Sequence, residues 1–170
     1  MTAERPAKPK KAKPPKTSKP PGATAAPEHA AFEQAVRECF ARQGLMRQFG
    51  AWLDTVEAGC VVIEVPYSER LSNQHGGFHG GVAGAIGDAA GGCAALSLMP
   101  TGSEVATVEY KINVMRQATG RSLRAEARIL RHGRSLSVAQ IDIAAIGADG
   151  TREAVALMQA TYMRMAPADG

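Results

Sequence analysis

The chain has 170 residues, a length typical of one domain with a single hydrophobic core. Its net charge of +4 arises within residues 1–27, which hold seven of the 20 basic residues, one of the 16 acidic residues and seven of the ten prolines. Residues 28–170 carry a net charge of −2, so their composition does not favour a nucleic-acid-binding domain, which needs a basic surface.

Residues 1–27 form a Lys- and Pro-rich tail with almost no apolar side chain larger than alanine. Such a segment cannot bury enough surface to offset the entropy lost on ordering, so we expect a disordered tail ahead of a folded domain at residues 28–166. The tail has no apolar stretch of the secretory-signal type. Its charge could bind nucleic acid or anionic lipid, but a solvated appendage is the more common role.

The three cysteines, Cys39, Cys60 and Cys93, are odd in number and form no C-x-x-C pair. This spacing favours reduced thiols in the cytoplasm over disulfides or a zinc site, and no metal site is expected. Residues 82–99 are apolar enough to resemble a membrane segment, but Asp88 lies in their middle. An acid at the bilayer centre costs at least ~2.5 kcal/mol, so a buried helix of a non-membrane protein is predicted.

The first half of the domain begins with helical spacing of apolar residues over 28–49. Residues 52–57 and 60–66 are two short β-type runs around Ala58-Gly59, which predicts a hairpin. A glycine-rich turn over 73–78 then leads into an apolar helix over 79–98, rich in glycine and alanine.

After Pro100 the pattern changes to apolar and polar residues in alternation, over 106–114, 123–129, 139–145 and 155–163. Short turns separate these runs, and Asp149-Gly150 is a strong hairpin signal. Strands of period two joined by short turns predict an antiparallel sheet with one apolar face. The economical arrangement is an α+β domain in which this sheet wraps around the helix at 79–98.

The candidate catalytic residues lie on that central helix. Its first residues, His79-Gly80-Gly81, offer free N–H groups at the positive end of the helix dipole, which is the geometry of an oxyanion site. Asp88 is an acid among small apolar residues, which is costly unless the group is paired or functional. Gly80 and Asp88 lie eight positions apart, or about 12 Å at 1.5 Å per residue. If both act on one carbonyl, they must come from two chains.

These motifs resemble the hotdog-fold acyl-coenzyme A thioesterases, and specifically their phenylacetate-pathway (PaaI-like) branch. The resemblance rests on Asn73, then His79-Gly80-Gly81, then Asp88 nine residues after the histidine. It also includes residues 107–113 (TVEYKIN) and residues 131–135 (RHGRS). The resemblance implies the hotdog fold and hydrolysis of acyl-coenzyme A to free acid and coenzyme A. It also implies a homodimer, with two such dimers associating into a dimer of dimers.

The resemblance also implies roles for single residues. Asp88 would be the nucleophile or the general base, and the Gly80 amide would polarise the thioester carbonyl with help from Asn73. Thr107 would position the water or the carboxylate, although strict alternation puts it on the polar face, so its role requires a β-bulge or a site at the end of the strand. His79 is expected to start the helix rather than to carry protons.

Coenzyme A is part of the substrate, and no further cofactor is implied. Gln117 stands where relatives often have proline, which we expect to loosen the strand end nearby. Phe78, Met46, Met99 and Met115 suggest an apolar, adaptable acyl pocket that suits aromatic or medium-chain groups. The residues expected to contact the nucleotide part of coenzyme A are Arg116, Arg131, His132, Gly133, Arg134 and Ser135.

Other functions remain open from the sequence. The chain could be a non-catalytic acyl-coenzyme A-binding protein, or a dimeric module whose basic tail binds nucleic acid. A metal site at His75 and His79 is disfavoured, because the intervening glycines do not present the pair on one helical face. A hotdog dehydratase would need a catalytic histidine for which no position is evident.

Overall fold

The computed structural model describes residues 29–165; the expected disordered tail and the outer limits of the predicted domain lie outside them. The elements are α1 (His29–Arg42), α2 (Gly44–Phe49), β1 (Trp52–Glu57), β2 (Cys60–Pro66), η1 (Glu69–Leu71), α3 (Gly80–Leu96), β3 (Glu104–Val114), β4 (Ser122–His132), β5 (Leu136–Ile146) and β6 (Arg152–Met165).

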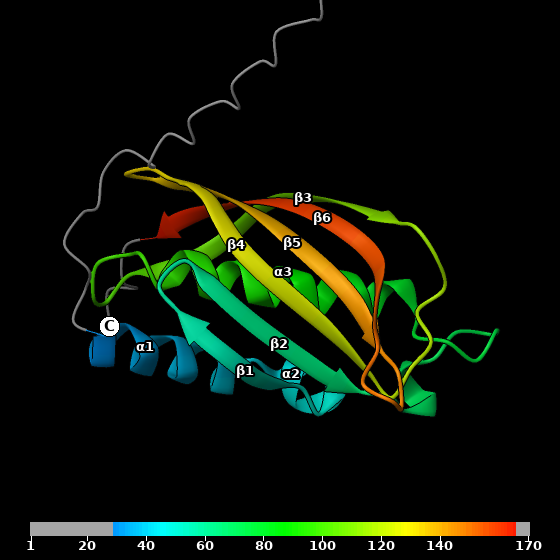
Figure 1. The fold of residues 1–170 in the computed structure, drawn as a ribbon. Helices are drawn as coiled ribbons and strands as arrows, with labels where there is room; N and C mark the ends of the chain where they lie inside the picture. Colours follow the sequence, from blue (N-terminus) through cyan, green and yellow to red (C-terminus); the bar gives the residue numbers. More distant parts are fainter. Residues whose placement is uncertain (1–28, 166–170) are drawn as a thin grey trace, which may run out of the picture.

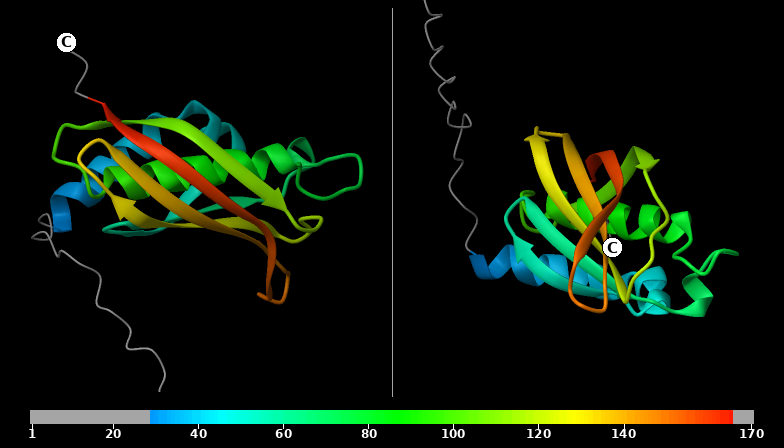
Figure 2. Two further views of the ribbon diagram at one scale, coloured as in Figure 1. Left: turned by 90° about the horizontal axis from the view of Figure 1, so that it is seen from above. Right: turned by 45° about the vertical axis from the view of Figure 1, so that its right-hand side comes forward.

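One antiparallel sheet of six strands, in the order β1-β2-β4-β5-β6-β3, curves around α3 (Figures 1 and 2). The α+β hotdog architecture expected from the sequence is therefore confirmed. The hairpin β1–β2 joins the same sheet through β4, and β3 pairs with β6 at the opposite edge. Helix α1 packs against α3 on the side that the sheet leaves open, and α2 packs against α1.

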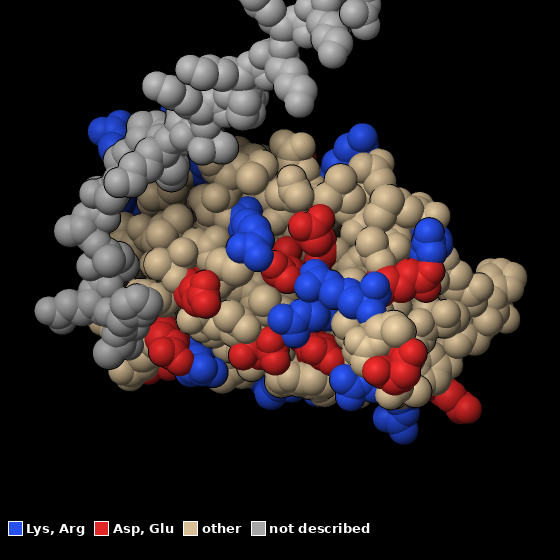
Figure 3. All heavy atoms as spheres, viewed as in Figure 1, with Lys and Arg blue, Asp and Glu red and all other residues tan. Residues whose placement is uncertain are grey.

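Alternation along the strands explains this curvature. Apolar side chains on one face of β2, β4, β5 and β6 meet α3, and the largest of these buried residues include Ile63, Leu123, Ile141, Ile143 and Met158. The opposite face is polar, and in Figure 3 acidic and basic side chains alternate over it instead of forming a basic patch. Arg124, for example, contacts both Asp54 and Glu64 from the same strand face.

The glycines of α3 allow the sheet to approach the helix closely. A Cβ added at Gly87 would lie 2.7 Å from the sulfur of Met158, and one at Gly91 would overlap the hydroxyl of Tyr162. Glycine at these two positions thus permits close packing of the helix on the sheet.

Two details differ from the predicted elements. The predicted helix at 28–49 is broken at Gln43, whose backbone is extended and separates α1 from α2. The predicted alternation in β3 is interrupted by a β-bulge, because the register with β6 shifts between Thr107 and Glu109. Val108 was expected on the apolar face but is 53% exposed. The bulge turns Thr107 toward α3 instead.

Within residues 29–165 no helix is long and apolar enough to span a membrane. The apolar segment that raised this question is α3, and 13 of its 17 residues are buried under the sheet and the N-terminal helices.

Two neighbouring glycines of α3 offer a matched test of the helix–sheet contact. Gly91→Ala places a methyl group against the Tyr162 ring, which is fully buried and hydrogen-bonded, so we expect a loss of roughly 1–3 kcal/mol in unfolding free energy. Gly92→Ala places its methyl group 3.7 Å from the same ring, an ordinary contact, and gains up to about 1 kcal/mol from helix propensity. Urea unfolding of both variants measures the difference, and equal stabilities would contradict this packing.

Candidate active site

Asn73 builds the loop that leads into α3. Its side-chain oxygen accepts hydrogen bonds from the backbone N–H groups of His75, at 2.9 Å, and Gly77, at 3.3 Å. Its amide nitrogen donates to the Phe78 carbonyl at 3.3 Å. The side chain predicted to orient a substrate carbonyl therefore holds the loop that places the first residues of α3.

His79 caps α3. Its backbone is extended, and its Nδ1 accepts a hydrogen bond from the Gly81 N–H at 2.9 Å, so the neutral ring carries its proton on Nε2. This is the helix-start role expected for His79. Gly80, the first residue of the helix, is exposed, and no described residue accepts a hydrogen bond from its N–H. One backbone donor at the helix N-terminus is thus left for a ligand oxygen.

Gln117 ties the same loop to the segment after β3. Its side-chain amide donates to the His75 carbonyl at 3.0 Å, and the Phe78 N–H donates to the Ala118 carbonyl at 2.8 Å. Glutamine thus supplies a cross-link that proline has no side-chain donor to make, and the expected loosening of the strand end stays a prediction. This junction borders a cavity of about 180 Å³, whose lining includes Asn73, Phe78, His79, Gly80, Val114, Arg116 and Gln117.

Asp88 lies two helical turns further along α3, with its side chain partly buried. The Thr107 hydroxyl donates to its Oδ1 at 2.8 Å, a contact that exists because the β-bulge turns Thr107 toward the helix. The Tyr162 hydroxyl donates to the Asp88 backbone carbonyl at 3.1 Å. Burial raises the pKa of the Asp88 carboxyl, while hydrogen bonding by the hydroxyls opposes the rise. No described cation forms an ion pair with Asp88 within 4 Å, so no side chain of residues 29–165 neutralises its charge.

A second and larger cavity, of about 480 Å³, opens at Asp88. Thr107, Tyr110 and Tyr162 line it together with residues of α1, α2 and α3. It shares no lining residue with the cavity at Gly80. The structure thus divides the predicted residues into two groups at different places on one protomer: Asn73, His79, Gly80 and Arg116 in the first, and Asp88 with Thr107 in the second.

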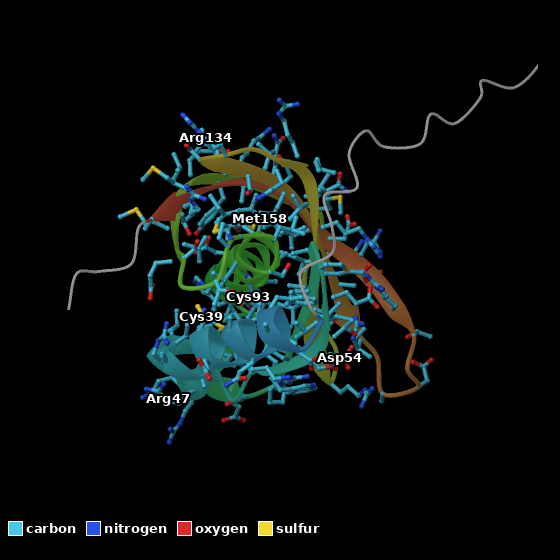
Figure 4. The ribbon with its side chains drawn as sticks, turned by 90° about the vertical axis from the view of Figure 1, so that its left-hand side faces the viewer. Cys39, Arg47, Asp54, Cys93, Arg134 and Met158 are labelled. Carbon is cyan, nitrogen blue, oxygen red and sulfur yellow. The ribbon has the colours of Figure 1, made fainter. Side chains whose placement is uncertain are left out.

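The residues expected to contact coenzyme A are also divided. Arg116 forms an ion pair with Glu153 beside the Gly80 cavity. The others lie in the β4–β5 hairpin, where Gly133 N–H donates to the Leu136 carbonyl at 2.8 Å and His132 Nδ1 lies 2.9 Å from the Ser137 hydroxyl. Arg134 stands at the tip of this hairpin (Figure 4). Arg131 and Arg134 are exposed, and Ser135 accepts a backbone hydrogen bond from Arg164 through its carbonyl.

Sequence reasoning missed Tyr162 and Tyr110. Tyr162 is completely buried, and its hydroxyl supports α3 at Asp88, which explains why Gly91 beside it has no side chain. The available signal was a tyrosine on the apolar face of a strand, since a buried phenol usually needs a hydrogen-bond partner. Tyr110 also faces α3, with its hydroxyl near Gly84, and it lines the Asp88 cavity.

Known proteins with similar sequences and folds include several thioesterases. Residues 75–148 match the model of the Thioesterase superfamily. The crystal structure of a thioesterase family protein from Silicibacter pomeroyi is 39% identical, with a TM-score of 0.77, and the match covers 79% of this chain and 98% of that one. A Halobacterium salinarum protein named as a candidate esterase is 32% identical over 109 residues, covering 59% of this chain and 69% of that protein.

The PaaI protein of E. coli, from the phenylacetic acid degradation operon, is 19% identical with a TM-score of 0.71, and the match covers 82% of this chain and 96% of that one. At this identity the similarity shows the shared fold alone. The 39% identity to the Silicibacter protein, over nearly the whole length of that protein, establishes that the two chains are related. The chain belongs to the thioesterase superfamily.

Proposed function

We propose that this protein hydrolyses acyl-coenzyme A thioesters to a free acid and coenzyme A, in active sites that two chains build together. The observation that carries the proposal is the separation of Asp88 and Gly80, which border different cavities and lie about 12 Å apart along α3. A carboxylate and an oxyanion donor acting on one carbonyl must be within a few Å of it, so each needs its counterpart from a second copy.

The chemistry requires few groups because a thioester carbonyl is already electrophilic. Asp88 either attacks the carbonyl carbon, expelling the coenzyme A thiolate and leaving a mixed anhydride that water cleaves, or takes a proton from the water that attacks. On both routes the carbonyl oxygen gains negative charge, which the Gly80 N–H of the other chain stabilises. Thr107 positions the carboxylate through its bond to Oδ1. The raised pKa of the Asp88 carboxyl makes this residue a stronger base than an exposed aspartate.

The second copy fits at the β3 edge. This strand pairs with β6 on one side and ends the sheet on the other, so its outer backbone groups have no strand partner within residues 29–165. Val108 and Val114 on this strand are 53% and 59% exposed, and Met115, which follows it, is 57% exposed. Antiparallel pairing here would bring two α3 helices together in opposite directions, with Asp88 of each facing Gly80 of the other. Association of such dimers in pairs stays a prediction.

We assign coenzyme A binding to the residues predicted for it: Arg116, Arg131, His132, Gly133, Arg134 and Ser135. Exposed Arg131 and Arg134 suit phosphate contacts, because guanidinium groups bind phosphate in a bidentate manner. Arg116 would have to exchange its bond to Glu153 for a phosphate. The similarity in fold to PaaI supports, at the level of proposal, membership of the PaaI-like branch.

Gly80 allows a test of a backbone donor. Gly80→Pro removes the N–H, and proline is favoured at the first position of a helix after an extended residue such as His79. We expect kcat to fall by roughly 100-fold or more. Gly80→Ala keeps the N–H, and its Cβ meets nothing within 4 Å, so this matched control should stay near wild-type activity. Steady-state hydrolysis of an acyl-coenzyme A series measures both, and equal activities of the two variants would remove Gly80 from the mechanism.

The shared site predicts complementation between inactive subunits. Asp88→Asn and Gly80→Pro chains, each inactive alone, should recover about a quarter of wild-type activity when refolded together in equal amounts, since half of the dimers are mixed and each has one intact site. Mass spectrometry of the mixture confirms that mixed dimers form. Mixed dimers without activity would contradict the two-chain site.

Thr107 predicts a change in pH dependence. Activity needs the ionised Asp88. An exposed aspartate has a pKa of about 4, and the raised pKa of Asp88 places the acidic limb of kcat/KM at a higher pH than that. Thr107→Val removes the hydrogen bond that lowers this pKa, so the limb should move to higher pH, while Thr107→Ser should leave it in place. The pH profiles of the three proteins test this, and an unmoved limb in Thr107→Val argues against the contact.

The raised pKa of Asp88 also predicts that its ionisation lowers the unfolding free energy of the protein. Because its pKa is higher in the folded chain than in the unfolded chain, its ionisation favours unfolding once the pH rises above the unfolded pKa. Asp88→Asn removes that ionisation and should unfold at a higher temperature than wild type at neutral pH. The difference should shrink as the pH falls toward about 4. Calorimetry across this pH range shows the effect, and a less stable variant at neutral pH would contradict it.

A further inference from the structure

Three hydroxyl groups line the cavity at Asp88, and they belong to Thr107, Tyr110 and Tyr162. Two of them donate to Asp88 itself: the Thr107 hydroxyl to its Oδ1 at 2.8 Å, and the Tyr162 hydroxyl to its backbone carbonyl at 3.1 Å. The Tyr110 hydroxyl forms no hydrogen bond with any group of residues 29–165. One hydroxyl donor of this cavity is therefore left for a ligand.

The Tyr110 side chain lies between β3 and α3. Its neighbour across the strand pair is Ala160, which is completely buried, so both side chains are on the face of the sheet that α3 covers. The hydroxyl reaches α3 at Gly84, where an added Cβ would lie 3.3 Å from its oxygen. Tyr110 is nevertheless 45% exposed, because β3 is an edge strand. Its hydroxyl is thus held on the surface of α3, at the edge where the second chain is proposed to bind.

Gly84 lies midway along α3 between the two groups of the proposed site. It comes four residues after Gly80 and four residues before Asp88. Residues four apart lie on the same face of a helix, about 6 Å from one another along its axis. In the antiparallel arrangement proposed above, Asp88 of one chain faces Gly80 of the other. The Tyr110 hydroxyl of the chain that supplies Asp88 then lies one helical turn from that residue, on the face that meets the thioester.

A separation of this size suits two groups that act on one carbonyl. An attacking oxygen stands about 3 Å from the carbonyl carbon, the carbonyl bond is about 1.2 Å long, and an O–H···O hydrogen bond is about 2.7 Å long. A carbonyl that meets Asp88 at its carbon can therefore hold its oxygen within reach of the Tyr110 hydroxyl. Negative charge develops on that oxygen during the reaction, and a hydroxyl donor stabilises it.

We infer that Tyr110 is a further catalytic residue, whose hydroxyl donates a hydrogen bond to the thioester oxygen in the site that contains Asp88 of its own chain. The inference rests on the proposed function, because it requires a thioester held between two chains. The oxygen then accepts two hydrogen bonds, from the Tyr110 hydroxyl of one chain and from the Gly80 N–H of the other. Tyr110 keeps its proton throughout, and the coenzyme A thiolate remains the leaving group.

Tyr110→Phe removes the hydroxyl and keeps the ring. Because the lost hydrogen bond strengthens in the transition state, we expect kcat and kcat/KM to fall together by roughly 100-fold, with little change in KM. Steady-state hydrolysis of an acyl-coenzyme A series measures this change. Thermal unfolding and the mass of the assembly in solution show that the variant is folded and associated like the wild type.

Mixed dimers provide the matched control, because the same substitution can be placed on either chain. In dimers of Asp88→Asn and Gly80→Pro chains, the one intact site takes its Asp88 from the Gly80→Pro chain. Tyr110→Phe on that chain should remove most of the recovered activity. On the Asp88→Asn chain it affects only the site that is already inactive, so the recovery should remain. A hydroxyl that merely stabilised the fold or the dimer would lower the activity of both mixtures equally.

Loss of the recovered activity from the Gly80→Pro chain alone supports the inference. Equal loss from both placements, loss from the Asp88→Asn chain alone, or an unchanged kcat in the Tyr110→Phe homodimer overturns it. The proposed function still stands in these three cases, because the wild type hydrolyses the substrate. Mixed dimers without activity when Tyr110 is intact overturn the two-chain site and the inference with it. A wild-type protein that hydrolyses none of the substrates overturns the proposed function as a whole.

Discussion

The rigidity of one helix is the constraint on which the rest of this structure depends. Asp88 and Gly80 both belong to α3, and a helix holds residues eight positions apart at about 12 Å. No movement of side chains within one protomer closes that distance, because one of the two groups is a backbone amide. A mechanism that uses both must therefore be a property of an assembly, for which we propose the edge strand β3 as the surface.

The packing around α3 serves the same site. Glycine at position 91 lets the Tyr162 ring reach the helix, where its hydroxyl binds the carbonyl of Asp88. The β-bulge in β3 brings Thr107 to the carboxylate of the same residue. Asp88 has no ion-pair partner among the described residues, and burying an unpaired acid disfavours its charged form, so these contacts hold the group in place against that cost.

The two ends of the site are held in different ways. At Gly80 the donor is a backbone group, so its position depends on the loop that Asn73 folds and that Gln117 fastens to the end of β3. At Asp88 the group is a side chain on a buried helix, held by the sheet. The cavity at Asp88 is also bordered by α1 and α2, which are not part of the sheet.

The sequence by itself determined the strands and the central helix and singled out Asp88 as a candidate, because period-two alternation, glycine spacing and an acid in an apolar helix are local signals. It also determined that Gly80 and Asp88 cannot meet within one chain, since helical rise follows from spacing alone. The tertiary structure decided what local patterns do not encode. The bulge that turns Thr107 inward appears only in the pairing of β3 with β6, and the cavity beyond Asp88 exists only where separate helices meet. Both depend on contacts between residues far apart in the chain, which no window of sequence contains.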